Sequence, residues 1–140
     1  MIEIIIPGEV QAQERPRFSR RGSFVQTYDP PKSKNYKKYV KECAEKYRPK
    51  ELLDVALELS IDVYRTPPKN ISKAKKNRVE IEEETLRPIT KPDVDNYAKG
   101  IKDALTGVIW TDDSKVVDLR VSKFYSMNPR AEVKIKILGE

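Results

Sequence analysis

Acidic side chains gather in one short stretch of an otherwise basic chain. Of the nine aspartates among the 140 residues, six lie between Asp93 and Asp118. Carboxylates held this close repel one another unless a cation lies between them, and oxygen ligands of this kind suit a hard ion such as Mg²⁺. The basic remainder of the chain would attract a polyanion toward that ion. This pattern favours metal-dependent cleavage of nucleic acid.

Two groups of residues within this stretch are candidates for the chemistry. Asp93 and Asp95 lie at the start of an expected helix, and Lys99 follows Asp95 by four residues, so both point away from the apolar stripe of that helix. Asp112 and Asp113 lie in an expected turn between strands. Each group also has an ordinary explanation. Aspartates are common in the first turn of a helix, and Asp95 and Lys99 can be a surface ion pair. Asp112 and Asp113 can simply form the turn. A helix followed by a hairpin, however, can bring the second group back to the start of the helix.

Basic residues are concentrated in two other parts of the chain. Residues 15–50 hold twelve Lys or Arg against three Asp or Glu, so their balance of +9 exceeds the +6 of the whole chain. Such asymmetry indicates a polyanionic partner, although a solvated basic face remains the alternative for each residue. The residues that we expect to contact DNA are Arg15, Arg17, Arg20, Arg21, Lys69, Lys73, Lys75 and Lys76.

Composition excludes several other classes of protein. A single cysteine, Cys43, rules out a disulfide framework within the chain, and the lack of histidine excludes His-ligated zinc and any Ser–His or Cys–His pair. No apolar run approaches the roughly 20 residues that a membrane span requires. The segment Ile2–Pro7 is too short and too acidic for a signal peptide. We therefore expect a cytoplasmic protein with no membrane partner and no small-molecule cofactor.

The hydrophobic periodicity predicts one domain over residues 1–140, of the α+β class, with a mixed β-sheet and two main helices packed on it. The expected strands are 2–6, 53–65, 108–110, 116–125 and 131–138, and the expected helices are 34–47, with Ser33 as its N-cap, and 92–106. Residues 10–29 are expected to be irregular apart from a short strand near 24–28, and 69–87 to be a mobile loop with one short helix at most.

The aromatic residues carry further expectations. Helical spacing predicts that Tyr36, Tyr39 and Tyr47 lie in the core. Trp110 is expected to pack against the second helix and fix the turn that carries the aspartate pair. Phe18 and Phe24 lie near a strand, where aromatic residues are usually part of the core, and the alternative is a wedge that enters DNA.

The acidic stretch resembles the signature of a known family. The run Lys-Pro-Asp-Val-Asp-Asn-Tyr-Ala-Lys at 91–99, the Asp-Ala-Leu that follows at 103–105 and the segment 107–118 are similar in order, spacing and residue type to the RusA Holliday-junction resolvases. The N-terminal half, with Arg-Pro-Arg-Phe at 15–18, resembles the phage-type members more loosely. These resolvases are small homodimeric endonucleases of bacteria and their phages and prophages.

The resemblance implies a function and a site. Asp93, Asp95 and Asp113, with Asp112 beside it, would bind a divalent metal, usually Mg²⁺, for which Mn²⁺ can substitute, and Lys99 would be essential for cleavage. The substrate would be four-way (Holliday) junction DNA, resolved by paired symmetric nicks during recombination or repair.

Some alternatives stay open. The segment between Leu105 and Trp110 is shorter than in the enterobacterial-type members, so the metal ligand is either Asp112 or Asp113. A general branched-DNA nuclease would use the same residues, and a non-catalytic, structure-specific DNA-binding protein is a second alternative. An RNA-binding protein is a third, but the chain lacks the aromatic-rich motifs of the usual RNA modules.

Overall fold

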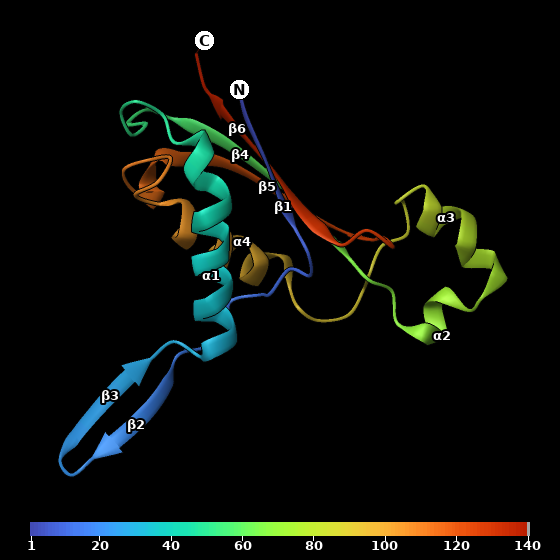
Figure 1. The fold of residues 1–140 in the computed structure, drawn as a ribbon, viewed down its shortest axis with the longest axis horizontal. Coiled ribbons are helices and arrows are strands. Elements are labelled where there is room, and N and C mark those ends of the chain that lie inside the picture. The colour runs from blue at the N-terminus through green and yellow to red at the C-terminus, as the bar shows by residue number, and fades with distance from the viewer. Residues whose placement is uncertain (140) are drawn as a thin grey trace.

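Four strands form a mixed sheet in this computed structural model, which describes residues 1–139 (Figure 1). In chain order they are β1 (Ile2–Pro7), β4 (Leu57–Arg65), β5 (Val116–Tyr125) and β6 (Arg130–Ile137). The spatial order is β1–β6–β4–β5, with β6 antiparallel to both of its neighbours and β4 parallel to β5. The predicted class, an α+β fold with a mixed sheet and two main helices, is confirmed.

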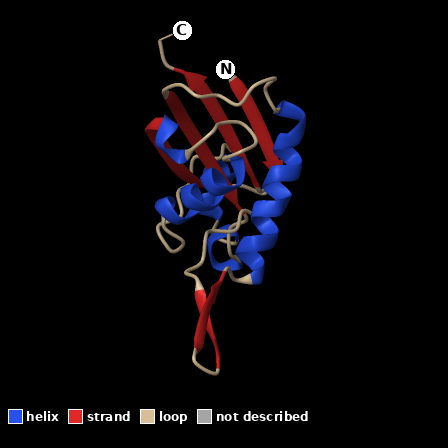
Figure 2. Ribbon diagram, turned by 90° about the vertical axis from the view of Figure 1, so that its left-hand side faces the viewer, coloured by secondary structure: helices blue, strands red, loops and turns tan. Residues whose placement is uncertain are grey.

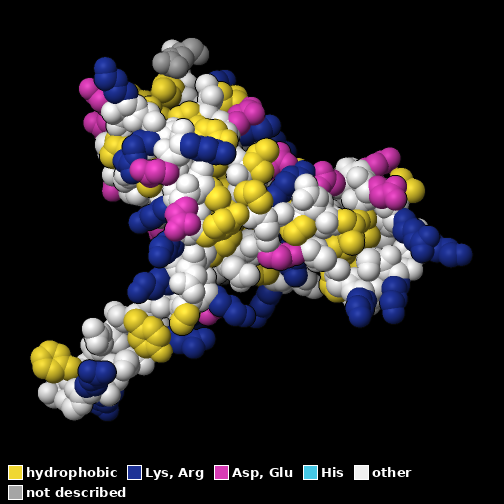
Figure 3. All heavy atoms as spheres, in the orientation of Figure 1, with side chains coloured by type: hydrophobic (Ala, Val, Ile, Leu, Met, Phe, Trp, Pro, Cys, Tyr) yellow, Lys and Arg dark blue, Asp and Glu magenta, His cyan; other side chains and the backbone are white. Residues whose placement is uncertain are grey.

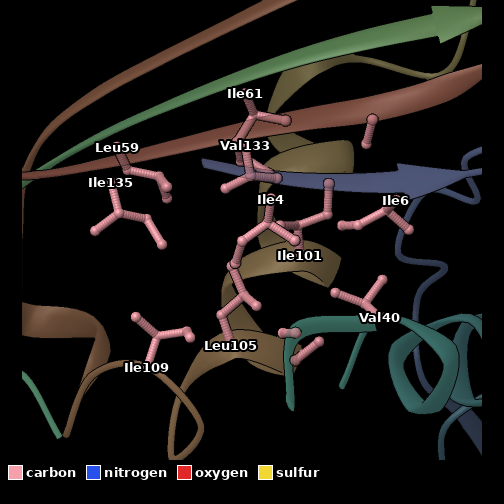
Figure 4. Packing of buried hydrophobic residues seen from close by; sticks show 14 of the residues in the cluster. Ile4, Ile6, Val40, Leu59, Ile61, Ile101, Leu105, Ile109, Val133 and Ile135 are labelled. Atoms are coloured by element: carbon pink, nitrogen blue, oxygen red, sulfur yellow. The ribbon is translucent and has the colours of Figure 1, made fainter. Parts of the chain in front are cut away.

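Two helices, α1 (Pro31–Ala44) and α4 (Val94–Leu105), pack against each other and cover one face of the sheet (Figure 2). The sheet supplies alternating apolar residues to this face, such as Leu59 and Ile61 of β4, which are fully buried. They meet Ile101 of α4 and Val40 of α1 (Figure 4). Each fully buried side chain of this size contributes about 1.5–3 kcal/mol, so this interface fixes where α4 lies on the sheet.

The first helix begins three residues earlier than predicted. Pro31 occupies its first turn, where a proline is tolerated because the missing N–H would have no partner there. Ser33, the predicted N-cap, lies inside the helix instead, and its hydroxyl accepts a hydrogen bond from the Glu14 N–H at 2.9 Å. The α-helix ends at Ala44 and continues as a 3₁₀ turn over Glu45–Tyr47.

The predicted irregular segment is partly a β-hairpin. Strands β2 (Arg17–Arg21) and β3 (Phe24–Tyr28) pair with each other and project from the body (Figures 1 and 2). The strand near 24–28 is confirmed, whereas the expectation of irregular structure over 17–21 was wrong. Every residue of both strands is exposed, so no burial pattern marks them in the sequence. Gly22 has a φ of +59°, which suits the two-residue turn of a hairpin.

The predicted loop 69–87 contains three short helical segments rather than one at most. They are α2 (Lys69–Ser72), a 3₁₀ turn over Lys75–Asn77 and α3 (Arg78–Glu82). Ile81 of α3 is buried. These segments form an arm that projects from the body in a different direction from the hairpin (Figure 1).

Two strand predictions need correction. The strand predicted from residue 53 begins at Leu57, and Leu53 makes only an isolated bridge with Trp110. Residues 108–110 form a turn and not a strand, because Gly107 (φ +85°) ends the helical run and its N–H donates to the Trp110 carbonyl at 2.7 Å. None of the helices that the structure describes is long and apolar enough to cross a membrane.

Three aromatic residues predicted for the core lie elsewhere. Tyr36 is buried as expected, but Tyr39 is 38% exposed, and its hydroxyl donates to the Pro7 carbonyl at 2.8 Å. Phe18 and Phe24 lie on the hairpin and are 72% and 78% exposed. The interpretation of Phe18 and Phe24 as core residues was therefore wrong.

Candidate active site

Helix α4 carries three of the predicted site residues near its N-terminus. Asp93 occupies the N-cap position, Asp95 lies in the first turn and Lys99 lies one turn further along, all exposed. Within the described residues the Asp93 side chain caps no backbone N–H of α4, so its carboxylate is not committed to holding the helix. The apolar side of the helix, with Tyr97 and Ile101, is buried. The polar side therefore faces away from the sheet, as predicted.

Two basic side chains of the sheet hold the segment that leads into α4. Arg65 of β4 donates to the Lys91 carbonyl at 2.9 Å. Lys123 of β5 donates to the carbonyls of Thr90 and Pro92 at 2.9 and 3.0 Å. Hydrogen bonds from charged donors are stronger than neutral ones. They tie the segment that precedes Asp93 to β4 and β5.

Asp113 is positioned by a partly buried hydrogen-bond network. Trp110 is fully buried, and its indole N–H donates to Thr106 Oγ1 at 3.0 Å. Thr106 Oγ1 lies 2.6 Å from Asp113 Oδ1 and 2.8 Å from the Lys102 carbonyl, either of which can accept its one proton. Trp110 thus fixes the turn from the end of α4, as predicted. Thr106 is a residue that the sequence did not reveal, because nothing in its spacing distinguishes it from an ordinary helix-terminal threonine.

The network places Asp113 beside the polar face of α4. A hollow of about 290 Å³ is lined by Asp95, Lys99 and Lys102 of α4 together with Asp113 and Leu119. Two of the predicted carboxylates and the predicted lysine therefore line one hollow, although Asp95 and Asp113 are far apart in the sequence. The turn lies against the end of α4, at Thr106, and not at its start as expected, and Asp113 lines the hollow from there.

Asp112 has a different role in the structure. Its carboxylate accepts hydrogen bonds from the Ser114 N–H at 3.0 Å and from the Ser114 hydroxyl, and so caps the 3₁₀ turn over Asp113–Lys115. The hydrogen bond from the Ser114 hydroxyl, together with that from its N–H, lowers the pKa of Asp112. Of the two neighbouring aspartates, Asp113 has the better access to the hollow of Asp95.

The structure does not bring all four aspartates together. Asp93 lines a separate hollow of about 580 Å³, with Arg15 and Asn96 among its other residues. Asp93 is the N-cap residue with extended backbone angles, whereas Asp95 lies inside the first turn, so the two side chains leave the helix in different directions. Within residues 1–139 no group of three or more acidic side chains lies close enough together to hold a metal ion. The ligand set of Asp93, Asp95, Asp113 and Asp112 thus stays a prediction.

A chain of charged side chains connects Lys99 with the base of the hairpin. Lys99 Nζ lies 3.9 Å from Asp103 Oδ2, which is also 3.9 Å from Lys37 Nζ of α1. Lys37 Nζ in turn lies 2.7 Å from Asp29 Oδ2, just after β3. Burial raises the pKa of Asp29, but hydrogen bonds from Lys37 and Gln13 outweigh it and lower the pKa overall. Asp29 is therefore a charged anchor between the hairpin and α1.

The predicted DNA-contacting residues lie on the two projecting arms, and all of them are exposed. Arg17, Arg20 and Arg21 belong to the hairpin, and Arg15 precedes it. The four lysines Lys69, Lys73, Lys75 and Lys76 lie on or between α2 and the 3₁₀ turn that follows it. Figure 3 shows basic side chains on both arms.

Comparison with known proteins identifies the family. The model of the family "Endodeoxyribonuclease RusA" matches residues 7–136. The chain is also 50% identical over 135 residues to "Uncharacterized protein YqaN" of Bacillus subtilis (strain 168), covering 96% of this chain and 95% of that protein. The match covers nearly the whole chain, and the family is one of Holliday-junction endodeoxyribonucleases. The chain is a member of the RusA family.

Proposed function

We propose that this protein is a Mg²⁺-dependent endonuclease that resolves four-way DNA junctions by paired symmetric nicks. The observation that carries the proposal is the hollow that Asp95 and Lys99 of α4 line together with Asp113. The match of the chain to the RusA family supports the same chemistry. The proposed biological role is DNA recombination or repair in the cytoplasm, in a prophage context.

The residues around the hollow fit a divalent ion. Asp95 and Asp113 would hold it, and Asp93 would complete the ligand set from the neighbouring hollow. Mg²⁺ commonly binds through one or two carboxylates and keeps several waters, so the two carboxylates that line the hollow would be sufficient donors. When bound, the ion activates water and offsets charge on a phosphodiester, and Mn²⁺ would substitute for it.

Lys99 is the proposed cationic group of the reaction. Its ammonium lies 3.9 Å from Asp103 Oδ2, beyond a close ion pair, so it can turn toward a phosphate in the same hollow. There it would stabilise the charge that develops on the attacked phosphate or give a proton to the leaving 3′ oxygen. Both roles stabilise charge that develops only in the transition state, so loss of Lys99 should affect cleavage more than DNA binding.

DNA binding is proposed to involve both arms. The arginines of the hairpin and the lysines of the other arm would contact mainly phosphates, which position the DNA and make binding fall steeply with salt. The set is Arg15, Arg17, Arg20, Arg21, Lys69, Lys73, Lys75 and Lys76.

A homodimer is part of the proposal, because a four-way junction has near two-fold symmetry and needs two matched nicks. Two copies related by a two-fold axis present two sites in that symmetry. Light scattering of the purified protein at micromolar concentration should give twice the 16.2 kDa chain mass. A chain that stays monomeric both alone and on a junction would contradict the dimer.

Matched substitutions at the aspartate pair test the metal site. Asp113→Asn should abolish junction cleavage in Mg²⁺, whereas Asp112→Asn should reduce it far less, because Asp112 caps a turn. EDTA should stop cleavage by the wild type. Full cleavage by Asp113→Asn, or a greater loss in Asp112→Asn, would overturn the assignment.

A further inference from the structure

The hairpin presents large apolar side chains to solvent at an unusual density. Phe18, Phe24, Val25 and Tyr28 are all exposed, and they lie within twelve residues of one another. A two-stranded hairpin by itself is only marginally stable in water. Exposed aromatic residues on such an element indicate that it acts against a partner. Figure 3 shows hydrophobic and basic side chains together on this arm.

Both faces of the hairpin combine apolar and basic side chains. Cross-strand pairs share a face, so Arg21 lies beside Phe24 on one face, and Phe18 and Val25 lie on the other with Arg20. Residues 15–28 contain four arginines and no acidic residue. The charge complements phosphate, and the rings complement the flat faces of bases.

The base of the hairpin opens into the region of the proposed catalytic lysine. A hollow of about 410 Å³ is lined by Arg15 and Tyr28 from the hairpin side and by Lys99 and Asp103 from α4. Asp29 anchors the hairpin to Lys37 of α1 at the same place. A nucleic acid bound at Lys99 would therefore extend naturally along the hairpin.

We propose that the hairpin recognises the branch point of the DNA, with Phe24 and Phe18 stacked on bases that are unstacked there. Its arginines bind the adjacent phosphates. This inference rests on the proposed function and names the feature that distinguishes a junction from a duplex.

The physical reason for selectivity is access to base faces. In a continuous duplex each base is covered above and below by its neighbours, so a phenyl ring finds only base edges. At a branch point the stack is interrupted and base faces become available, and each base stacked on an aromatic ring adds appreciable affinity. The aromatic rings therefore strengthen binding to branched DNA much more than to duplex.

The alternative binding partner of the hairpin is a second copy of this chain. The charge argues against it, because the four arginines would approach a protein that is itself net positive. A protein partner would also require apolar area but not aromatic rings, whereas stacking on a base requires a flat ring. Replacing a phenyl ring with an aliphatic side chain of similar apolar area therefore distinguishes a DNA partner from a protein partner.

The test measures binding to a four-way junction and to a continuous duplex of the same sequence, by fluorescence anisotropy in EDTA. Phe24→Ala should weaken junction binding by about fivefold or more and leave duplex binding almost unchanged. Phe24→Trp should keep junction binding near that of the wild type, whereas Phe24→Leu should weaken it as Phe24→Ala does. Met127→Ala, which shortens another exposed apolar side chain in the β5–β6 turn, is the matched control and should bind as the wild type does.

Equal losses on both DNAs, no loss at all, or rescue by leucine would overturn the inference. Conversion of Phe24→Ala to a monomer in light scattering would assign the hairpin to a second copy instead. Wild-type cleavage of the junction in Mg²⁺, measured in parallel, separates the two proposals. If the wild type cuts the junction and the variants bind it as tightly as the wild type does, only the proposed role of the hairpin fails. If the wild type neither binds nor cuts the junction, the proposed nuclease function fails as well.

Discussion

Removing one hydroxyl, in Thr106→Val, should affect both the stability of the fold and the nuclease activity. Thr106 Oγ1 accepts the indole N–H of fully buried Trp110 and lies 2.6 Å from Asp113 Oδ1. Valine has nearly the shape of threonine, so little packing is lost. The substitution leaves the indole N–H without its acceptor and Asp113 without its neighbour.

The size of the stability effect follows from burial. A buried donor left without a partner costs about 1–3 kcal/mol. For a domain of this length each kcal/mol lowers the Tm by roughly 4 °C, so Thr106→Val should melt about 4–12 °C below the wild type. Loss of a group that orients a metal ligand commonly reduces activity about 10–100-fold, and we expect junction cleavage to fall within that range.

Thr111→Val provides a matched control. The Thr111 hydroxyl donates to Asp54 Oδ1 at 3.0 Å, but at an exposed position, where a substitution usually changes stability by less than about 0.5 kcal/mol. Thermal unfolding by circular dichroism and single-turnover cleavage of a labelled junction would be measured for both variants. An unchanged Tm and cleavage rate in Thr106→Val, or equal losses in Thr111→Val, would refute the reasoning.

Three further predictions concern other contacts. Arg130 donates to Glu84 at 2.6 and 2.9 Å, and this hydrogen bonding lowers the pKa of Glu84 from its usual 4.5. The stabilisation is then complete above pH 4.5 and is lost as the pH falls below it, so urea unfolding should show Glu84→Gln less stable at neutral pH, with the gap closing in acid. Arg21→Ala should reduce the slope of log K against log salt for DNA binding by about 0.9, and an unchanged slope would exclude a phosphate contact. Lys99→Ala should slow cleavage about 100-fold or more with binding retained, whereas equal losses in Lys102→Ala would remove the special role of Lys99.

The parts of the fold that the sequence predicted are those with a strong burial pattern. The stripe of Tyr97 and Ile101 marks α4, and the alternation along 57–63 marks a strand, because each has one face in the core and one in solvent. The hairpin was missed over 17–21 because both of its faces are exposed, so its apolar residues follow no inward alternation. Phe18 and Phe24 were expected in the core because aromatic residues near a strand are usually buried, but both faces of this hairpin are exposed.

The candidate site was predictable by residue type but not by geometry. The spacing of Asp95 and Lys99 on one helix gave their common direction correctly. The choice between Asp112 and Asp113 depends on Ser114, which occupies one carboxylate, and on Thr106, which positions the other. The contact between Thr106 and Asp113 arises only when the turn packs against the end of α4.

The central claim is that this chain cuts four-way junctions at two symmetric positions with a metal bound at its aspartates. The most direct test is cleavage of a synthetic junction labelled on opposing strands, beside a flap and a linear duplex, for the wild type and Asp95→Asn. We predict paired nicks at symmetric positions on the junction alone, abolished by EDTA and by Asp95→Asn. Equal cutting of the flap or duplex, or full junction cleavage by Asp95→Asn in Mg²⁺, would contradict the account.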